Sequence, residues 1–286
     1  MTMAISRNRL NIGFELLCSL LVVSNLFSIR PIHGFISEPT TTFRRFSGLS
    51  MSSETATATP SKYKKVFVAG GSKGVGHAIV EKLSARGTEV VALVRSEESK
   101  TELNSMSGVT AILGDAFNQK DVENAMDGCD AAITTLGGTA ADRRVDYEGN
   151  NNVIESAGIL GVQRILLVTS VGCGSSKGAA PPNVFEILKD VLAAKEKAEN
   201  VLIEWYTNSN WSIIRPGGLV SEPMTGKAIL TEDTTAIGSI HREDVADLVI
   251  RAMDSPKTER VVLSAVDPSI ASQVAVKGKE IPAFEL

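Results

Sequence analysis

From residue 65 onward, short apolar runs alternate with longer amphipathic stretches of about ten residues or more. The runs at 90–94 and 165–168 are continuously hydrophobic, which is typical of strands buried on both faces of a parallel sheet. Alternation of such strands with helices indicates βαβ units wound into one sheet. The predicted strands are 66–69, 90–94, 111–113, 131–135, 165–169, 211–214 and 261–263.

Helical periodicity occupies the intervals between these strands. A helix is expected directly after the first strand, and others over 122–126, 149–157, 185–203 and 245–253. Because no repeat or internal linker interrupts the alternation, we expect an α/β fold with a doubly wound parallel Rossmann sheet in a single domain. This domain is predicted over 61–268, and 269–286 are predicted to form a C-terminal tail at the surface.

The first sixty residues have the composition of a targeting sequence. Arg7 and Arg9 precede the apolar run 16–27, which is broken by polar residues and is shorter than the roughly 20 residues of a membrane span. We therefore predict a signal peptide over 1–34 and no stable membrane span in the mature chain. Residues 35–60 are rich in Ser and Thr and poor in acids, which is typical of a disordered transit peptide.

A signal peptide followed by a transit-like stretch resembles the bipartite presequence that directs proteins into the plastids of diatoms and related algae. This resemblance implies a plastid (chloroplast) location for the mature domain. Two alternatives stay open: ordinary secretion, and a start at Met51 that would remove most of the leader from the protein.

Composition narrows the kinds of ligand and site. The chain has 286 residues with 29 basic and 33 acidic side chains, and this net charge of −4 argues against binding to nucleic acid. Its three cysteines have no C-x-x-C spacing and form no disulfide framework. The three histidines lie far apart in the sequence, so no metal site is predicted. A small ligand is favoured.

The first predicted strand leads into a glycine-rich segment that opens the following helix. A pyrophosphate needs backbone N–H groups at a helix N-terminus without Cβ atoms in the way, and a G-x-x-x-G-x-G spacing provides them. The sequence therefore predicts a dinucleotide site here. The residues assigned to it are Gly70, Gly71, Ser72, Lys73, Gly74, Val75 and Gly76. Lys73 could contact phosphate or be a solvated surface charge.

The end of the second strand indicates which dinucleotide binds. Arg95 follows this strand, where an NAD-selective site would carry Asp or Glu on the ribose 2′-hydroxyl. A guanidinium can hold a 2′-phosphate with two parallel hydrogen bonds, so the sequence predicts NADP rather than NAD. An exposed charge at a strand end is the alternative. Asp115 and Ala116, after the third strand, are predicted to meet the adenine edge or to form a plain turn.

Several segments together resemble the NmrA-like group of the atypical short-chain dehydrogenase/reductases, which has cyanobacterial and plastid members. The likeness extends from residue 65 to about 268. It is carried by 70–76, 114–115, 146–150, 167–172, 214–219 and 241–246.

The resemblance also implies roles for residues outside the glycine-rich loop. Leu136 and Gly137 would lie under the cofactor, and Lys195 would hydrogen-bond the nicotinamide ribose. The residues that would border the nicotinamide are Pro216, Gly217 and Gly218. Each assignment has a purely structural alternative. Leu136 and Gly137 could form a tight turn, Lys195 could lie on the helix surface, and residues 216–218 could form a turn that ends a strand.

The chain departs from the wider family at its catalytic dyad. A Tyr-x-x-x-Lys motif places a phenol and an ammonium on one helix face, and the lysine lowers the pKa of the phenol. In this chain Val191 stands four residues before Lys195, and none of the three tyrosines is followed by Lys at that spacing. The catalytic candidates are Lys195 and Ser170, although Ser170 could equally satisfy backbone at a strand end. No proton donor is assigned.

Without the dyad, we expect hydride transfer to an acceptor that can take its proton from solvent. The predicted function is therefore an NADPH-dependent reductase of a small planar acceptor, a flavin or a quinone. One alternative is a non-catalytic NADP(H)-binding module that senses redox state or recruits a protein partner. A sugar epimerase or dehydratase is a second alternative, which the missing base disfavours.

Overall fold

The computed structural model describes residues 62–138, 142–270 and 280–286. The leader segments predicted over 1–60 lie outside these residues. Within the described ranges, no helix is both long enough and apolar enough to cross a membrane. The strands are β1 (Lys65–Ala69), β2 (Glu89–Val94), β3 (Val109–Leu113), β4 (Ala131–Thr134), β5 (Arg164–Val168), β6 (Asn210–Pro216), β7 (Gly218–Val220), β8 (Ile229–Thr231), β9 (Ser239–His241) and β10 (Val261–Val266).

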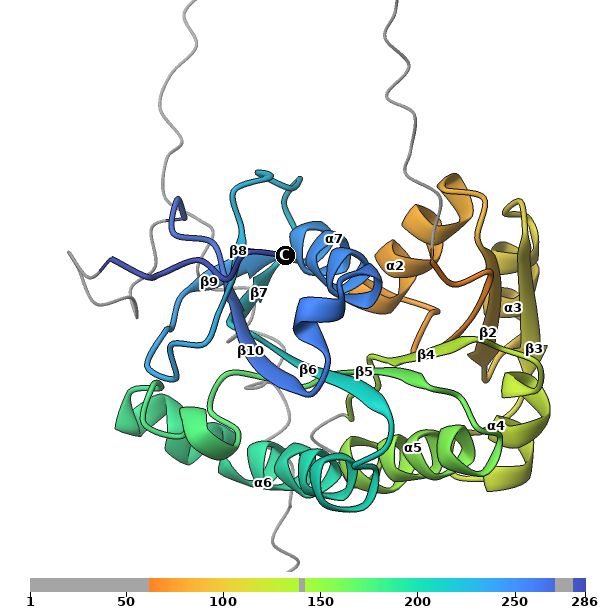
Figure 1. The fold of residues 1–286 in the computed structure, drawn as a ribbon, viewed down its shortest axis with the longest axis horizontal. Helices are drawn as coiled ribbons and strands as arrows, with labels where there is room; N and C mark the ends of the chain where they lie inside the picture. The colour runs from red at the N-terminus through yellow and green to blue at the C-terminus, as the bar shows by residue number, and fades with distance from the viewer. Residues whose placement is uncertain (1–61, 139–141, 271–279) are drawn as a thin grey trace, which may run out of the picture. The chain divides into compact units, whose positions relative to one another are not determined.

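Eight of these strands form one sheet in the order β3-β2-β1-β4-β5-β6-β10-β8 (Figure 1). All neighbouring pairs are parallel except β10 and β8, which run antiparallel at one edge. Strands β7 and β9 form a separate parallel pair. The predicted doubly wound Rossmann sheet is confirmed, and its strand order reverses between β1 and β4, the switch point at which such folds bind ligands.

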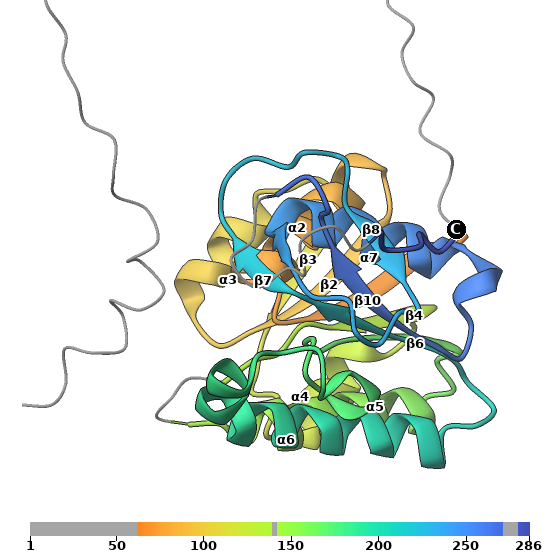
Figure 2. The ribbon, with the colours of Figure 1, turned by 90° about the vertical axis from the view of Figure 1, so that its left-hand side faces the viewer.

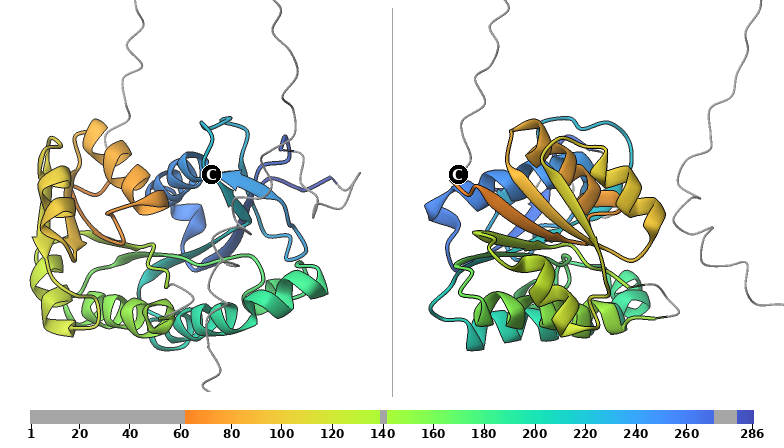
Figure 3. Two further views of the ribbon diagram at one scale, coloured as in Figure 1. Left: turned by 180° about the vertical axis from the view of Figure 1, so that it is seen from behind. Right: turned by 90° about the vertical axis from the view of Figure 1, so that its right-hand side faces the viewer.

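Helices cover both faces of this sheet. They are α2 (Gly74–Ala85), α3 (Glu97–Asn104), α4 (Gln119–Met126), α5 (Asn150–Ile159), α6 (Pro182–Trp205) and α7 (Arg242–Asp254), with a π-helical turn η1 (Val145–Gly149) before α5 and 3-10 turns η2 (Gly174–Ser176) and η3 (Pro256–Thr258). Helices α2, α3 and α7 lie on one face and α4, α5 and α6 on the other (Figures 1 and 2). Both layers are also visible from behind (Figure 3).

Each central strand contributes side chains to both faces. In β1, Val66 and Val68 pack in the core beneath α2 and α7, whereas Phe67 and Ala69 pack in the core beneath α4, α5 and α6. All four side chains are fully buried. Burial on both faces explains why the strand sequences are continuously apolar. It also leaves the strand ends as the places where polar side chains can meet a ligand.

The last described residues return to the core. Phe284 donates its backbone N–H to the carbonyl of Leu230 in β8, with 2.6 Å between nitrogen and oxygen. Phe284 and Leu286 are partly buried against the core beneath α2 and α7. The end of the predicted tail is therefore anchored to the domain, a contact that the weak periodicity of this segment did not indicate.

Arg164, the first residue of β5, is the largest fully buried side chain of the described residues. Its guanidinium donates to the carbonyls of Ala252 and Met253 at the end of α7, at 2.7 and 3.1 Å. It also donates to the carbonyl of Asn210 and to the hydroxyls of Ser212 and Thr258. Burial lowers the pKa of this guanidinium. The carbonyls at a helix C-terminus carry partial negative charge, so they stabilise the buried cation.

We expect Arg164→Met to lower the free energy of unfolding by about 3–5 kcal/mol, because it leaves several buried acceptors without a donor. Urea unfolding followed by circular dichroism measures this loss. The matched control is Arg251→Met, which removes an exposed arginine paired with Asp247 and should change stability by less than about 1 kcal/mol. Equal effects of the two substitutions would contradict the role given to Arg164.

Candidate functional site

A cleft lies at the carboxyl ends of β1, β2, β3 and β4, beside the switch point. It holds about 710 Å³ of space, a figure that includes volume open to solvent. The cleft is lined by Ala69, Gly70, Ser72, Lys73, Leu93, Val94, Arg95, Gly114, Asp115, Ala116, Thr135, Leu136, Gly137 and Val145. Eight of the predicted cofactor residues are therefore brought together, from four separate loops.

The glycine-rich loop is shaped by a close approach of its own backbone. A Cβ atom on Gly76 would lie 2.1 Å from the Gly70 carbonyl oxygen, so no side chain fits there. Gly70 has φ +85° and Gly74 has φ +62°, in the region that favours glycine. Gly71 is buried beneath the loop, next to Val80.

The N-terminus of α2 is prepared for an anion. Its first turn carries no acidic residue, and the residue before it, Lys73, gives no side-chain cap to the helix N–H groups. These donors and the positive end of the helix dipole face the cleft that Gly70, Ser72 and Lys73 line. The loop therefore has the form and charge that a pyrophosphate requires, although the individual contacts of Gly74, Val75 and Gly76 with a cofactor stay predictions.

Two basic side chains line the cleft. Lys73 and Arg95 are exposed and line it. Arg144, which sequence reasoning missed, lies 4.9 Å from the centroid of the Phe117 ring and pairs with Asp142 through two hydrogen bonds. Arg144 lowers the pKa of Asp142 to about 2, with a smaller contribution from Arg95. Asp142 therefore pairs with Arg144, whereas the cations that line the cleft are Lys73 and Arg95.

Asp115 is partly committed to the turn in which it lies. Its Oδ1 accepts the backbone N–H of Phe117 at 3.0 Å, and its own N–H donates to Asp121 Oδ2 at 3.0 Å. These two hydrogen bonds are those expected if Asp115 serves only to form a turn. Its carboxylate nonetheless lines the cleft beside Ala116, and its predicted contact with adenine is untested.

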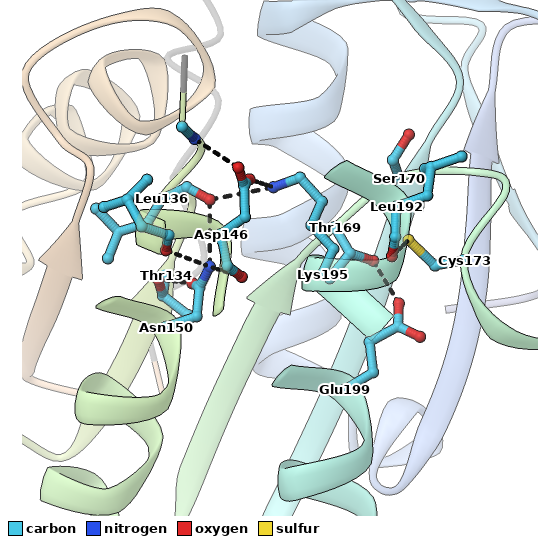
Figure 4. Close-up of polar contacts among 12 residues, drawn as sticks. Thr134, Leu136, Asp146, Asn150, Thr169, Ser170, Cys173, Leu192, Lys195 and Glu199 are labelled. Atoms are coloured by element: carbon cyan, nitrogen blue, oxygen red, sulfur yellow. Dashed lines mark hydrogen bonds and ion pairs between the residues drawn. The ribbon is translucent and has the colours of Figure 1, made fainter. Parts of the chain in front are cut away.

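Lys195 on α6 is not among the residues that line the cleft, but it is bonded to Leu136, which does line it. Two partners hold its ammonium (Figure 4). Its Nζ forms a 2.8 Å ion pair with Asp146 Oδ1 and donates to the Leu136 carbonyl at 3.2 Å. The Asp146 side chain is 1% exposed and that of Lys195 12% exposed. Asp146 Oδ2 also accepts the backbone N–H of Gly138 at 3.0 Å. One buried carboxylate therefore fixes both the lysine and the loop after β4.

Asn150 completes the support of this loop (Figure 4). Its Oδ1 accepts the hydroxyl of Thr134 at 2.6 Å, and its Nδ2 donates to the carbonyls of Asp146 at 3.0 Å and Leu136 at 3.3 Å. Asp146 lies on the π-helical turn η1 and Asn150 opens α5. Leu136 and Gly137 are thus set in place by buried polar groups.

Ser170, the other predicted catalytic residue, is bonded locally. Its Oγ donates to the Val171 carbonyl at 3.0 Å, as expected for a hydroxyl that satisfies backbone at a strand end. Next to it, Thr169 donates to the buried Glu199 at 2.6 Å. Cys173 is fully buried, and burial, followed by the charge of Glu199, raises the pKa of its thiol to about 12. These groups are not among the residues that line the cleft.

The segment predicted to border the nicotinamide forms the crossing from β6 to β7. Gly217 donates its N–H to the Ala265 carbonyl at 2.9 Å, and Gly218 donates to the Gly238 carbonyl at 2.8 Å. A Cβ atom on Gly217 would lie 2.2 Å from the Gly238 oxygen. Pro216 ends β6 and is buried. The strand-ending-turn alternative accounts for these contacts, and the segment is not part of the cleft lining.

Known proteins are similar to this chain in sequence. A family model described as NAD(P)H-binding matches residues 70–256. The uncharacterized sugar epimerase YhfK of Bacillus subtilis is 33% identical over 202 residues, which cover 68% of this chain and 90% of that protein. Sanguinarine reductase of Eschscholzia californica is 28% identical over 245 residues, covering 69% of this chain and 86% of that protein. Several other relatives are chloroplastic plant proteins.

Among solved structures, ChuY, an anaerobilin reductase from Escherichia coli O157:H7, superposes with a TM-score of 0.66 at 29% identity and covers 72% of this chain and 98% of its own. The family model spans the glycine-rich loop and most of the sheet that positions the cleft. The chain therefore belongs to the NAD(P)H-binding family, as a member of the NmrA-like atypical short-chain dehydrogenase/reductases that its sequence resembles.

Proposed function

We propose that this protein is an NADPH-dependent reductase that transfers a hydride to a small planar acceptor such as a flavin or a quinone. The observation that carries the proposal is the buried Asp146–Lys195 pair beside a cleft that opens on the bare N-terminus of α2. NADPH, when bound, supplies the hydride, and the protein's own groups orient it. The names of two similar proteins, sanguinarine reductase and anaerobilin reductase, support a reductase.

Lys195 is suited to hold a ribose. An ammonium has three N–H donors, and within the protein it contacts two acceptors, Asp146 Oδ1 and the Leu136 carbonyl. One donor is left for a hydroxyl in the cleft. The 2.8 Å ion pair with Asp146 fixes the direction of the ammonium. In this role Lys195 positions the cofactor and donates no proton.

The cleft favours a reductase over an epimerase. Among its lining residues, the ionisable side chains are Lys73, Arg95 and Asp115, and Asp115 is engaged in its own turn. Oxidation of a sugar hydroxyl requires a positioned base, whereas a flavin or quinone can take its proton from solvent. The epimerase name of the Bacillus relative is therefore not carried over to this chain.

NADP rather than NAD is the proposed cofactor. Arg95 is an exposed cation of the cleft at the end of β2, where a 2′-phosphate would lie, and Lys73 of the glycine-rich loop is a second exposed cation of the cleft. We also propose a plastid location, which the chloroplastic relatives support at moderate identity. The bipartite leader predicted over 1–60 would provide the address.

Arg95→Gln should weaken NADPH binding by about 10- to 100-fold, because it removes a charge-assisted contact to the 2′-phosphate. NADH, which lacks this phosphate, should bind both forms equally. Isothermal titration calorimetry of the purified full chain gives both dissociation constants. Arg251→Gln, an exposed arginine paired with Asp247 on α7, is the control. A parallel loss of NADH affinity in Arg95→Gln would argue against selective recognition of the phosphate.

Steady-state oxidation of NADPH, followed by absorbance with flavin and quinone acceptors, should reveal turnover. Lys195→Ala should lower kcat by about 10- to 100-fold, since the ribose loses its positioned donor. Lys189→Ala removes an exposed lysine of the same helix, paired with Glu186, and should leave the rate unchanged. Tight NADPH binding without turnover on any acceptor would reject the reductase and favour the non-catalytic module.

A further inference from the structure

A second groove is lined by residues of η1, α5 and α6 and by the residue after α6. Helices α5 and α6 are neighbours in the layer that covers this face of the sheet (Figures 1 and 2). This second groove has no lining residue in common with the cofactor cleft. The groove is lined by Tyr147, Asn151, Glu155, Val201, Trp205 and Tyr206. The proposed reductase chemistry uses none of these side chains.

Aromatic rings are concentrated in this groove. The whole chain has three tyrosines and two tryptophans, and two of the former and one of the latter line it. Trp205 is the most exposed of the large hydrophobic side chains in the described residues, at 76%. The other tryptophan, Trp211, is 6% exposed. Exposed Trp and Tyr side chains offer large apolar faces at low entropic cost and are enriched at binding sites.

Gly158 leaves space for the ring of Tyr206. A Cβ atom on Gly158 of α5 would lie 2.1 Å from Cε1 of Tyr206, so the ring rests directly on the helix backbone. This contact fixes the Tyr206 ring where α5 and α6 end. Tyr206 is consequently half-buried, with its ring forming one side of the groove.

The groove lining also includes the carboxylate of Glu155. Asn151 donates its Nδ2 to Glu155 Oε1 at 2.8 Å, which holds the glutamate side chain along the groove. Glu155 and Tyr206 both line the groove. Burial raises the pKa of the Tyr206 hydroxyl, and the negative charge of Glu155 raises it further. At the other end of the groove, Lys197 Nζ lies 5.8 Å from the centroid of the Tyr147 ring. That distance is within the range of cation–π attraction.

We propose that this groove binds an organic cation, an alkylated ammonium or a guanidinium group, against the rings of Trp205 and Tyr206 and beside the carboxylate of Glu155. Aromatic faces are negative at their centres and attract weakly hydrated cations. The carboxylate adds a charge that a neutral apolar ligand could not use. The cation could be a free molecule or a basic side chain of another protein, and both present the same chemistry.

Tryptophan emission reports on this site, because of the two tryptophans only Trp205 is exposed. The full chain is titrated with choline and, separately, with 3,3-dimethyl-1-butanol, its uncharged carbon analogue, at matched ionic strength. Choline should change the emission with a dissociation constant at least about tenfold lower than that of the alcohol. Equal responses to the two compounds, or no response to choline, would overturn the proposal.

A charge-matched pair of variants tests the role of the carboxylate. Glu155→Gln should raise the dissociation constant for choline by about three- to tenfold. Glu204→Gln removes the same charge from an exposed residue next to Trp205 that does not line the groove, and should have no effect. If both variants bind choline equally weakly, the effect comes from the overall charge of the protein, and a specific site at Glu155 is rejected. Unchanged thermal unfolding and NADPH binding verify that each variant is folded.

The source of the cation is tested with a third probe, N-acetyl-arginine amide, in the same assay. Tighter binding of this probe than of choline supports a protein side chain as the ligand, and the reverse order supports a free ammonium compound. Failure of both probes overturns the site. None of these outcomes depends on whether NADPH is oxidised, so they are independent of the reductase proposal.

Discussion

The position of the cofactor cleft depends on one steric constraint, the crossing of the backbone at Gly70 and Gly76. Because a Cβ atom on Gly76 would lie 2.1 Å from the Gly70 oxygen, α2 can begin this close to β1 only when residue 76 has no side chain. The helix N-terminus then faces the space above β1 and β4, where the strand order reverses. The positive end of the helix dipole and the opening in the sheet therefore coincide.

The opposite wall of the cleft depends on buried polar side chains instead of bare backbone. Asn150 and Asp146 are each 1% exposed, and between them they hold Leu136, Gly138 and Lys195. Because these groups satisfy one another within the fold, Leu136 and Gly138 after β4 are held in place without a ligand. Such preorganisation lowers the entropy that binding would otherwise lose. One wall therefore offers the N-terminus of α2 to an anion, and the other is supported by the ammonium of Lys195, whose direction is fixed by Asp146.

Sequence reasoning found the features of this site that are local and missed those that join distant segments. The strands and the loop from Gly70 to Gly76 follow from apolar runs and glycine spacing, which neighbouring residues determine. Asp146 was seen only as part of a family motif, since its pairing with Lys195 joins η1 to α6 and the π-helical turn has no periodicity to read. Helix α3 escaped prediction because Leu103 is its one buried residue. Arg144 was missed because its contact with Phe117 is a ring-face interaction without a sequence signature.

Three enclosed cations differ in how many of their donors the protein itself satisfies. Arg164 directs its donors to carbonyls and hydroxyls near the start of β5 and β6 and the end of α7, and Arg215 directs its donors to Glu199 and Ser175. Both are satisfied inside the protein and nearly or fully buried. Lys195 has a buried counter-ion as well, but its side chain keeps a small exposed fraction and its ammonium has a donor to offer. With the Cys173 thiol held protonated by burial, the residues around this lysine favour orientation of a hydride donor over acid–base catalysis.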